Sequence, residues 1–300
     1  MSSLRIIRRR LRSVQSTKQI MRAMQLVSGS KLRRAQGRLL QARMVLEFLD
    51  GLLQRVLAAA PPARPSREPG RAPLEHALCA PREGPDLLVV CTSDAGLCGS
   101  YNTNILQLAE SHLRRDTARR TQLVYIGKKG HRYFTRRGYA AEAAYVDLAG
   151  RPDPAKAEAI GRSLMERFLS GRAGSVQLLY SRFLSPMVYR PTMLPWLPIQ
   201  LDSNAPTRQR ANAPTEEYIF EPSPRRIFED LLPRWALAKF QLVLLEAFTS
   251  EHSARMIAMK NATDNAEELI NGLTRTRNKI RQAVITKEIS EITGTAEALK

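Results

Sequence analysis

Apolar residues recur every three or four positions along the first 56 residues of the chain. If Leu4 is heptad position a and Ile7 is position d, the a and d series continue to Leu53 and Val56, and thirteen of these sixteen positions are apolar. This spacing is typical of a helix in a coiled coil. It predicts one helix over residues 1–58, roughly 80 Å long at about 1.5 Å per residue.

Three polar residues, Lys18, Gln25 and Ser28, interrupt the a and d series in its middle. Polar side chains at core positions weaken apolar packing between helices. We therefore expect this part of the seam to be loose or hydrated, or to face something other than its partner helix.

Beyond this helix, the pattern changes twice. Residues 58–73 are rich in proline, which cannot continue a helix, so residues 59–85 are a predicted linker. Strand-like and helix-like stretches then alternate: strands at 86–94, 122–130 and 175–183, and helices at 103–115 and 154–171. This alternation predicts an α/β domain with a mostly parallel sheet over residues 86–215. Residues 190–199 look extended and interrupted by proline, and residues 202–214 look like a polar loop.

Helical spacing returns after "EYIFEPSP" (217–224) and continues almost to the end, which defines a predicted C-terminal helix within residues 216–300. At about 1.5 Å per residue, residues 225–298 would be roughly 110 Å long. Pro233 predicts a kink or a break in its first turns. The apolar positions that indicate its seam are Ala262, Ala266, Leu269, Leu273, Ile280 and Ala283. Long helices at both ends predict an antiparallel, two-helix coiled coil with the α/β domain inserted between its helices.

The chain carries 47 Lys and Arg against 28 Asp and Glu, a net charge of +19. Residues 3–46 hold twelve cations and no acid, and the first acid is Glu47. Such a field favours an anionic partner. An Arg-rich, acid-free N-terminus also resembles a mitochondrial transit peptide. The heptad pattern, however, continues in phase far beyond a usual cleavage point.

Two short glycine-containing stretches are candidates for an anion site. They are "TSDAGLCGSYN" (92–102) and "IGKKG" (126–130), but neither has the GK[ST] or GxGxxG spacing of nucleotide-binding loops. A tight turn and an exposed strand-end loop are the favoured interpretations.

The four histidines lack metal-ligand spacing, so no metal site, cofactor or catalytic centre is predicted. Cys79, Cys91 and Cys98 are expected to be reduced thiols.

No apolar run reaches the roughly 18 residues that a membrane span needs. We therefore expect any association with a membrane to be peripheral.

Small and flexible residues dominate "SEHSARMIAMKNATDNAEELI" (250–270). Small residues allow helices to approach closely, and methionine adapts to changing neighbours. From the pattern alone, this stretch fits an ordinary coiled-coil core equally well.

Four separated blocks carry a resemblance to a known family. They are "SVQSTKQIMRAMQLVSGSKLRRAQ", "TSDAGLCGSYN", "YIFEPSP", and "EHSARMIAMKNATDNA" with "RNKIRQAVITKEISEI". In this order they resemble the gamma subunits of bacterial-type F-type ATP synthases, along essentially the whole chain. The resemblance implies a Rossmann-like α/β domain inserted in an antiparallel coiled-coil shaft. It also implies a non-catalytic rotor of the central stalk, which couples proton flow to ATP synthesis or hydrolysis.

The resemblance further implies the partners: the alpha and beta subunits of the catalytic hexamer, the epsilon subunit and the membrane c-ring. It places the chain peripherally on the cytoplasmic face of the bacterial inner membrane. By matching positions, the expected contacts with the catalytic ring are Met24, Lys31, Arg255, Arg281, Gln282, Thr286 and Glu288. Tyr218 and Glu221 are the expected contacts with epsilon and the membrane ring. No inserted dithiol segment is visible, so thiol regulation is not expected.

Two other functions remain open at this point. A basic coiled-coil protein that binds nucleic acid, or serves as a scaffold, would explain the charge through salt-dependent phosphate contacts. Aromatic residues, which stack on bases, make up only 6% of the chain. An enzyme built on the α/β layer would instead turn over a small molecule by itself.

Overall fold

The computed structural model describes residues 2–59, 74, 76–116, 121–148, 150, 153–200 and 220–298. The chain divides into two compact units. Unit 1 joins Met1–Ser30 with Arg255–Lys300, and unit 2 is Lys31–Ala254. Each unit therefore contains part of both terminal helices. The segment boundaries expected from the sequence stay predictions, and most of the expected linker and the loop at 202–214 lie outside the described residues.

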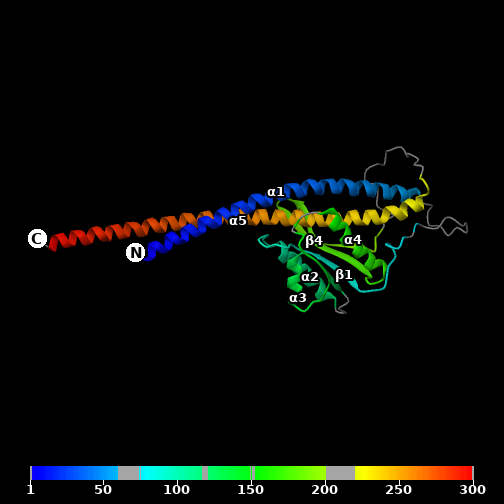
Figure 1. Ribbon diagram of the computed structural model, residues 1–300, viewed down its shortest axis with the longest axis horizontal. Helices are drawn as coiled ribbons and strands as arrows, with labels where there is room; N and C mark the ends of the chain where they lie inside the picture. Colours follow the sequence, from blue (N-terminus) through cyan, green and yellow to red (C-terminus); the bar gives the residue numbers. More distant parts are fainter. Residues whose placement is uncertain are drawn as a thin grey trace. The chain divides into compact units, whose positions relative to one another are not determined.

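Helix α1 spans Ser2–Ala59 without interruption (Figure 1). All sixteen predicted a and d positions, from Leu4 to Val56, are buried or half-buried, which confirms the seam. Leu32, Ala35 and Leu39 are each less than 5% exposed. The 3.5-residue repeat thus identifies the face of α1 that packs against the rest of the chain.

The α/β part of unit 2 holds one five-stranded sheet in the order β3-β2-β1-β4-β5. The strands are β1 Asp86–Cys91, β2 Gln122–Ile126, β3 Ala141–Tyr145, β4 Ser175–Ser185 and β5 Val188–Leu197. β1 pairs in parallel with β2 and β4, and β2 with β3, whereas β4 and β5 form an antiparallel hairpin. The predicted mostly parallel α/β sheet is confirmed.

Helices cover both faces of this sheet (Figure 1). α2 (Tyr101–Arg115) and α3 (Lys128–Thr135) pack on one face, around Tyr101, Ile105 and Phe134. α4 (Pro154–Leu169) and the first half of the C-terminal helix pack on the other. Gly161 on α4 allows this close packing, because a Cβ there would lie 2.8 Å from Leu237 Cδ2.

The sequence did not predict α3 or β3. "IGKKG" is not a loop at a strand end: β2 stops at Ile126, Gly127 turns the chain with φ 97°, and α3 begins at Lys128. Gly130 lets α3 pack tightly, since a Cβ there would be 2.9 Å from Thr92 Oγ1, which accepts its N–H at 2.8 Å. A helix of eight residues with an internal glycine, and a strand reading "AEAAY", give too weak a pattern to detect.

β5 is an edge strand and contains Pro191 and Pro195. Proline has no N–H to donate, so it is found in strands mainly at sheet edges. The segment expected to be extended and interrupted by proline is therefore a strand that pairs on one side only, with register shifts near both ends of the hairpin.

Helix α5 spans Pro224–Ala298 and contains Pro233. The helix continues through this proline, so the alternative of a break is wrong, and the alternative of a kink stays a prediction. In unit 2, Trp196 of β5 holds the turns of α5 that follow Pro233. Its Nε1 donates to the Ala236 carbonyl at 3.0 Å, and its ring packs on Phe240 with ring centroids 5.1 Å apart. This burial compensates for the backbone hydrogen bond that proline removes.

Polar groups also tie α1 to α5 inside unit 2. Arg43 lies 2.7 Å from the Glu246 carboxylate and donates a second hydrogen bond to the Phe183 carbonyl at 3.2 Å. Glu246 is only 5% exposed. Near the end of α1, Trp235 donates from Nε1 to Asp50. One cation thus joins both long helices and the β4–β5 hairpin.

Cys91 and Cys98 are buried, Cys79 is half-buried, and all three are free thiols. Burial raises the pKa of the Cys91 thiol to about 12. Among the described residues, no helix is apolar over a stretch long enough to cross a bilayer.

We predict that Arg43→Met lowers the free energy of unfolding by about 1–3 kcal/mol, because it leaves the buried Glu246 carboxylate without its cation. Thermal unfolding followed by circular dichroism would measure the loss. The matched control is Arg162→Met, which removes an exposed pair with Glu158 and should change stability by less than about 0.5 kcal/mol. Equal effects of the two variants would contradict the prediction, and adding Glu246→Gln to Arg43→Met should restore part of the loss.

Candidate functional site

Unit 1 is an antiparallel pair of helices (Figure 1). Lys18 Nζ on α1 lies 3.2 Å from Glu267 on α5, and a Cβ added to Gly29 would lie 3.5 Å from Met256 Sδ. From Lys18 to Gly29 the chain advances eleven residues, and from Glu267 to Met256 it goes back eleven. The predicted antiparallel arrangement is therefore confirmed within this unit.

From Met259 onward, one face of α5 carries its own heptad series of shielded residues. Spaced alternately by four and three, they are Met259, Thr263, Ala266, Ile270, Leu273, Arg277, Ile280 and Val284. Two positions taken from the sequence as seam residues are wrong: Leu269 is 52% exposed and Ala283 is exposed. Leu269 and Ala283 each precede a residue of the seam, Ile270 and Val284, by one position. The sequence alone therefore allowed a register shifted by one residue.

The polar interruption of the α1 seam faces α5, and two of its three residues, Lys18 and Gln25, stay partly open to solvent there. Lys18 forms its ion pair with α5, Gln25 is half-buried, and Ser28 is only 3% exposed. Ser28 and Gly29 are small, and Met256 lies against the backbone of Gly29. Small side chains let the helices approach closely at this level, which is why a polar residue becomes buried there.

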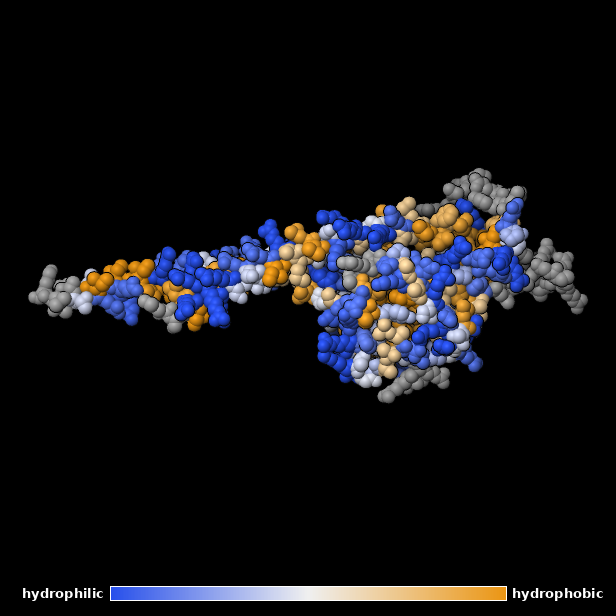
Figure 2. Space-filling view, viewed as in Figure 1, coloured by the Kyte–Doolittle hydropathy of each residue, from blue (hydrophilic) through white to orange (hydrophobic). Residues whose placement is uncertain are grey.

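The end of α5 extends beyond its pairing with α1. Every described side chain from Ile285 onward is exposed, in contrast to the half-buried Val284. Ile285, Ile289 and Ile292 repeat at i, i+4 and i+7 and are 46%, 57% and 68% exposed. Figure 2 shows apolar surface along this end of the helix. A single helix of about this length is marginal in water, so the extension presents an apolar stripe suited to a partner.

The part of helix α1 that belongs to unit 1 is cationic on its exposed side. Arg8, Arg9, Arg10 and Arg12 are exposed, and none of them forms an ion pair with another residue that the structure describes. Together with the apolar stripe on α5, they give unit 1 a surface that fits a partner with both apolar and acidic groups.

The predicted ring contacts are distributed over this surface and beyond it. Arg281, Gln282, Thr286 and Glu288 are exposed on the last third of α5. Met24 is half-buried and Arg255 is 9% exposed, both in unit 1.

The other predicted contacts lie elsewhere. Lys31 is exposed on α1 but belongs to unit 2. Glu221 is exposed just before α5, and Tyr218 lies outside the described residues.

The isoleucine stripe was not singled out from the sequence. Its spacing is visible there, but the same spacing indicates a buried seam, and only the structure shows that no residue it describes covers these isoleucines.

The stretch "TSDAGLCGSYN" is a structural turn. Ser93 N donates to Asn102 Oδ1 at 3.0 Å, and Asn102 Nδ2 donates to Cys98 Sγ at 3.1 Å. Leu97 adopts a left-handed conformation with φ 62°. These groups satisfy one another, so the favoured interpretation of a tight turn agrees with the geometry.

Lys128 of "IGKKG" is paired with acidic groups of its own domain. Lys128 Nζ lies 2.5 Å from Asp147 Oδ1, and Lys128 N donates to Asp94 Oδ1 at 3.0 Å. The hydrogen bond to Asp147 raises the pKa of Lys128, which stays charged and already has an acidic partner.

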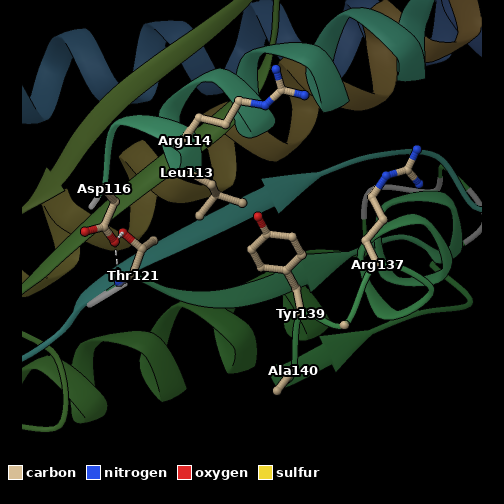
Figure 3. A pocket seen from close by; sticks show the side chains of 8 residues that line it. Leu113, Arg114, Asp116, Thr121, Arg137, Tyr139 and Ala140 are labelled. Atoms are coloured by element: carbon tan, nitrogen blue, oxygen red, sulfur yellow. Dashed lines mark hydrogen bonds between the residues drawn. The ribbon is translucent and has the colours of Figure 1, made fainter. Parts of the chain in front are cut away.

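A cavity of about 540 Å³ opens between the end of α2 and the turn that leads into β3 (Figure 3). In Figure 3, Asp116 accepts two hydrogen bonds from Thr121, at 2.8 Å from the backbone N and 2.6 Å from Oγ1. Arg137 is held by Glu110 at 3.3 Å and stacks on the Tyr133 ring. Asp116 and Arg137, at opposite parts of the cavity lining, are therefore each paired with a neighbour inside the domain.

Within the described part of the chain, no group of three or more His, Cys, Asp or Glu side chains could hold a metal ion. The arrangement as a whole is that of an interaction surface carried on long helices.

Comparison with known proteins agrees with this geometry. A family model described as ATP synthase matches residues 3–299. The ATP synthase gamma chain of Heliobacterium modesticaldum is 39% identical over 303 residues, and that of Desulforamulus reducens is 40% identical over 301 residues. Both alignments cover 100% of this chain and 100% of the relative.

Solved structures resemble the fold at low sequence identity. A chain of the Euglena gracilis mitochondrial ATP synthase (OSCP/F1/c-ring, rotational state 3) superposes with a TM-score of 0.66 at 18% identity, covering 99% of this chain and 95% of that one. A chain of the central stalk and c-ring of the Tetrahymena thermophila enzyme gives 0.58 at 22% identity, covering 81% and 99%. The full-length matches to curated relatives, together with the paired terminal helices, show that the chain belongs to the ATP synthase gamma chain family.

Proposed function

We propose that this chain is the rotor of the central stalk of a proton-translocating F-type ATP synthase. Its paired helices would turn inside a hexamer of alpha and beta subunits and change the nucleotide sites of that hexamer in sequence. The chain itself would make and break no bond. The observation that carries the proposal is the full-length family match. It agrees with the structure, in which the exposed arginines and the isoleucine stripe lie on long helices.

Asymmetry is the physical property that this role requires. To move a two-state site from 1:99 to 99:1 takes about 5.5 kcal/mol of differential contact. Unit 1 consists of two unlike helices, one with exposed arginines and one with an exposed isoleucine stripe. Such an object has a different surface in each direction, so rotation would offer each neighbour different contacts in turn.

The exposed arginines of α1 would attract acidic partner loops without holding the rotor at one angle. Exposed ion pairs contribute only about 0–1 kcal/mol each, so the arginines of α1 would attract acidic loops without fixing one angle. Met24, Lys31, Arg255, Arg281, Gln282, Thr286 and Glu288 are proposed as contacts with the catalytic ring. The exposed guanidinium group of Arg281 and the exposed amide group of Gln282 can donate hydrogen bonds to a surrounding loop.

We propose further that Tyr218 and Glu221 lie near the epsilon subunit and the c-ring. The chain would then be held peripherally at the cytoplasmic face of the bacterial inner membrane. The alternative function, a basic coiled-coil protein that binds nucleic acid or acts as a scaffold, is not supported, because the family model and curated relatives match along the whole chain.

The proposal is tested by isolating the native complex that contains this chain and identifying its subunits. Co-purification with alpha and beta ATPase subunits is the expected result. Isolation of the chain with nucleic acid and without ATPase subunits would reject the rotor function.

Gln282→Leu should lower the ATP hydrolysis rate of the purified complex by about fivefold, because it removes a hydrogen bond of about 1 kcal/mol to the catalytic ring. The matched control is Asn271→Leu, which makes a similar change at another exposed position of α5. An unchanged rate in the Gln282 variant, measured under steady-state conditions, would count against this contact.

Reversing Arg9, Arg10 and Arg34 to Glu should weaken assembly with the alpha and beta subunits, since it replaces part of the cationic surface of α1 with acid. The yield of assembled complex at increasing salt would measure the effect. A control with the same change in net charge is Arg132, Lys156 and Arg172 to Glu, all exposed on the α/β part of unit 2. Normal assembly of the first variant at physiological salt would refute the prediction.

A further inference from the structure

The β4–β5 hairpin ends in a cluster that the rotor function does not explain. We call the residues Arg182, Leu184, Met187, Val188 and Arg190 the hairpin tip. All five are exposed, with Leu184 at 48%, Met187 at 79% and Val188 at 43%. None of the three apolar side chains belongs to either hydrophobic core of unit 2.

Two like charges face each other across this hairpin. In the β4–β5 register, Arg182 lies directly opposite Arg190. Directly opposed side chains on neighbouring strands have Cβ atoms about 4.5–5.5 Å apart, and like charges there destabilise the pair. Neither arginine forms an ion pair with any residue that the structure describes, and the buried Glu246 is engaged by Arg43.

The hairpin is nevertheless held firmly. Ser250 donates to the Ser181 carbonyl at 2.9 Å, and Arg43 donates to the Phe183 carbonyl at 3.2 Å. Ser253 also donates to the Pro186 carbonyl, at the turn itself. Three side chains from α1 and α5 thus hold the backbone of β4 on both sides of Arg182 and the backbone of the turn.

We propose that the hairpin tip is a docking surface for an acidic segment of another subunit of the assembly. A carboxylate between the two guanidinium groups would relieve their repulsion, since arginine binds carboxylates through paired N–H groups. An apolar side chain beside that carboxylate would cover Leu184, Met187 and Val188. This inference rests on the proposed function, because it takes the partner from the ATP synthase complex.

Other occupants fit less well. A second copy of this chain would bring two more arginines to the same place and increase the repulsion. A membrane surface would need a larger apolar area than three side chains to bind stably. A nucleic acid would leave the apolar side chains without a role.

The decisive variant is Arg190→Glu, because it acts with opposite sign on stability and on docking. In the isolated chain it exchanges a repulsive cross-strand pair for an attractive one, so the melting temperature should stay the same or rise. In association with purified alpha, beta and epsilon subunits, it should weaken binding by about fivefold or more and reduce the dependence of binding on salt.

Two further variants accompany this test. Met187→Ser should also weaken association without changing the melting temperature, because Met187 is not in a core. Arg172→Glu carries the same charge reversal on an exposed residue outside the hairpin and should leave association unchanged.

Three results would overturn the inference. Equal binding of Arg190→Glu and the unaltered chain would reject the docking surface while leaving the rotor function intact. Loss of binding to phosphatidylglycerol vesicles in Arg190→Glu, with unchanged subunit association, would assign the tip to the membrane instead. Failure of the unaltered chain to associate with the subunits would reject the proposed function itself, and this inference with it.

Discussion

The paired stretches of α1 and α5 depend on side chains small enough for two helix backbones to lie close together. In unit 1, Ser28 is 3% exposed and Gly29 faces Met256; in unit 2, Ala35 and Ala247 are 3% and 2% exposed. At such positions a larger side chain would push the helices apart and expose the seam on both sides. The helices of each unit keep their contact because these residues leave room for it.

Much of this architecture could be predicted from the sequence, for reasons visible in particular residues. In α1, the a and d series keeps one spacing over eight heptads, so its register could be found even though apolar residues such as Ile20, Leu26 and Leu40 are exposed beside it. In α5, by contrast, Leu269 and Ala283 lie beside the seam, and local pattern could not separate them from Ile270 and Val284. Which of two adjacent stripes is buried depends on the partner helix, a long-range property.

The candidate surface was predictable only in part. Matching positions gave Arg281, Gln282, Thr286 and Glu288, which are exposed on α5. The isoleucine stripe became visible only when α1 was seen to end, and the opposed Arg182 and Arg190 only when the strand register was known. Contacts between residues far apart in the sequence cannot be read from a local pattern, which is why the hairpin tip was missed. The short α3 was missed because its own pattern is weak.

The prolines of β5 have a consequence for the chain before it finds its partners. An open sheet edge is a template on which strands from other molecules can add and begin aggregation. Pro191 and Pro195 stand four residues apart along that edge and remove two of the donors that an incoming strand would use. Before assembly, the β5 edge of the sheet is therefore a poor template for a strand from another molecule, which leaves β3 as the sheet edge without proline.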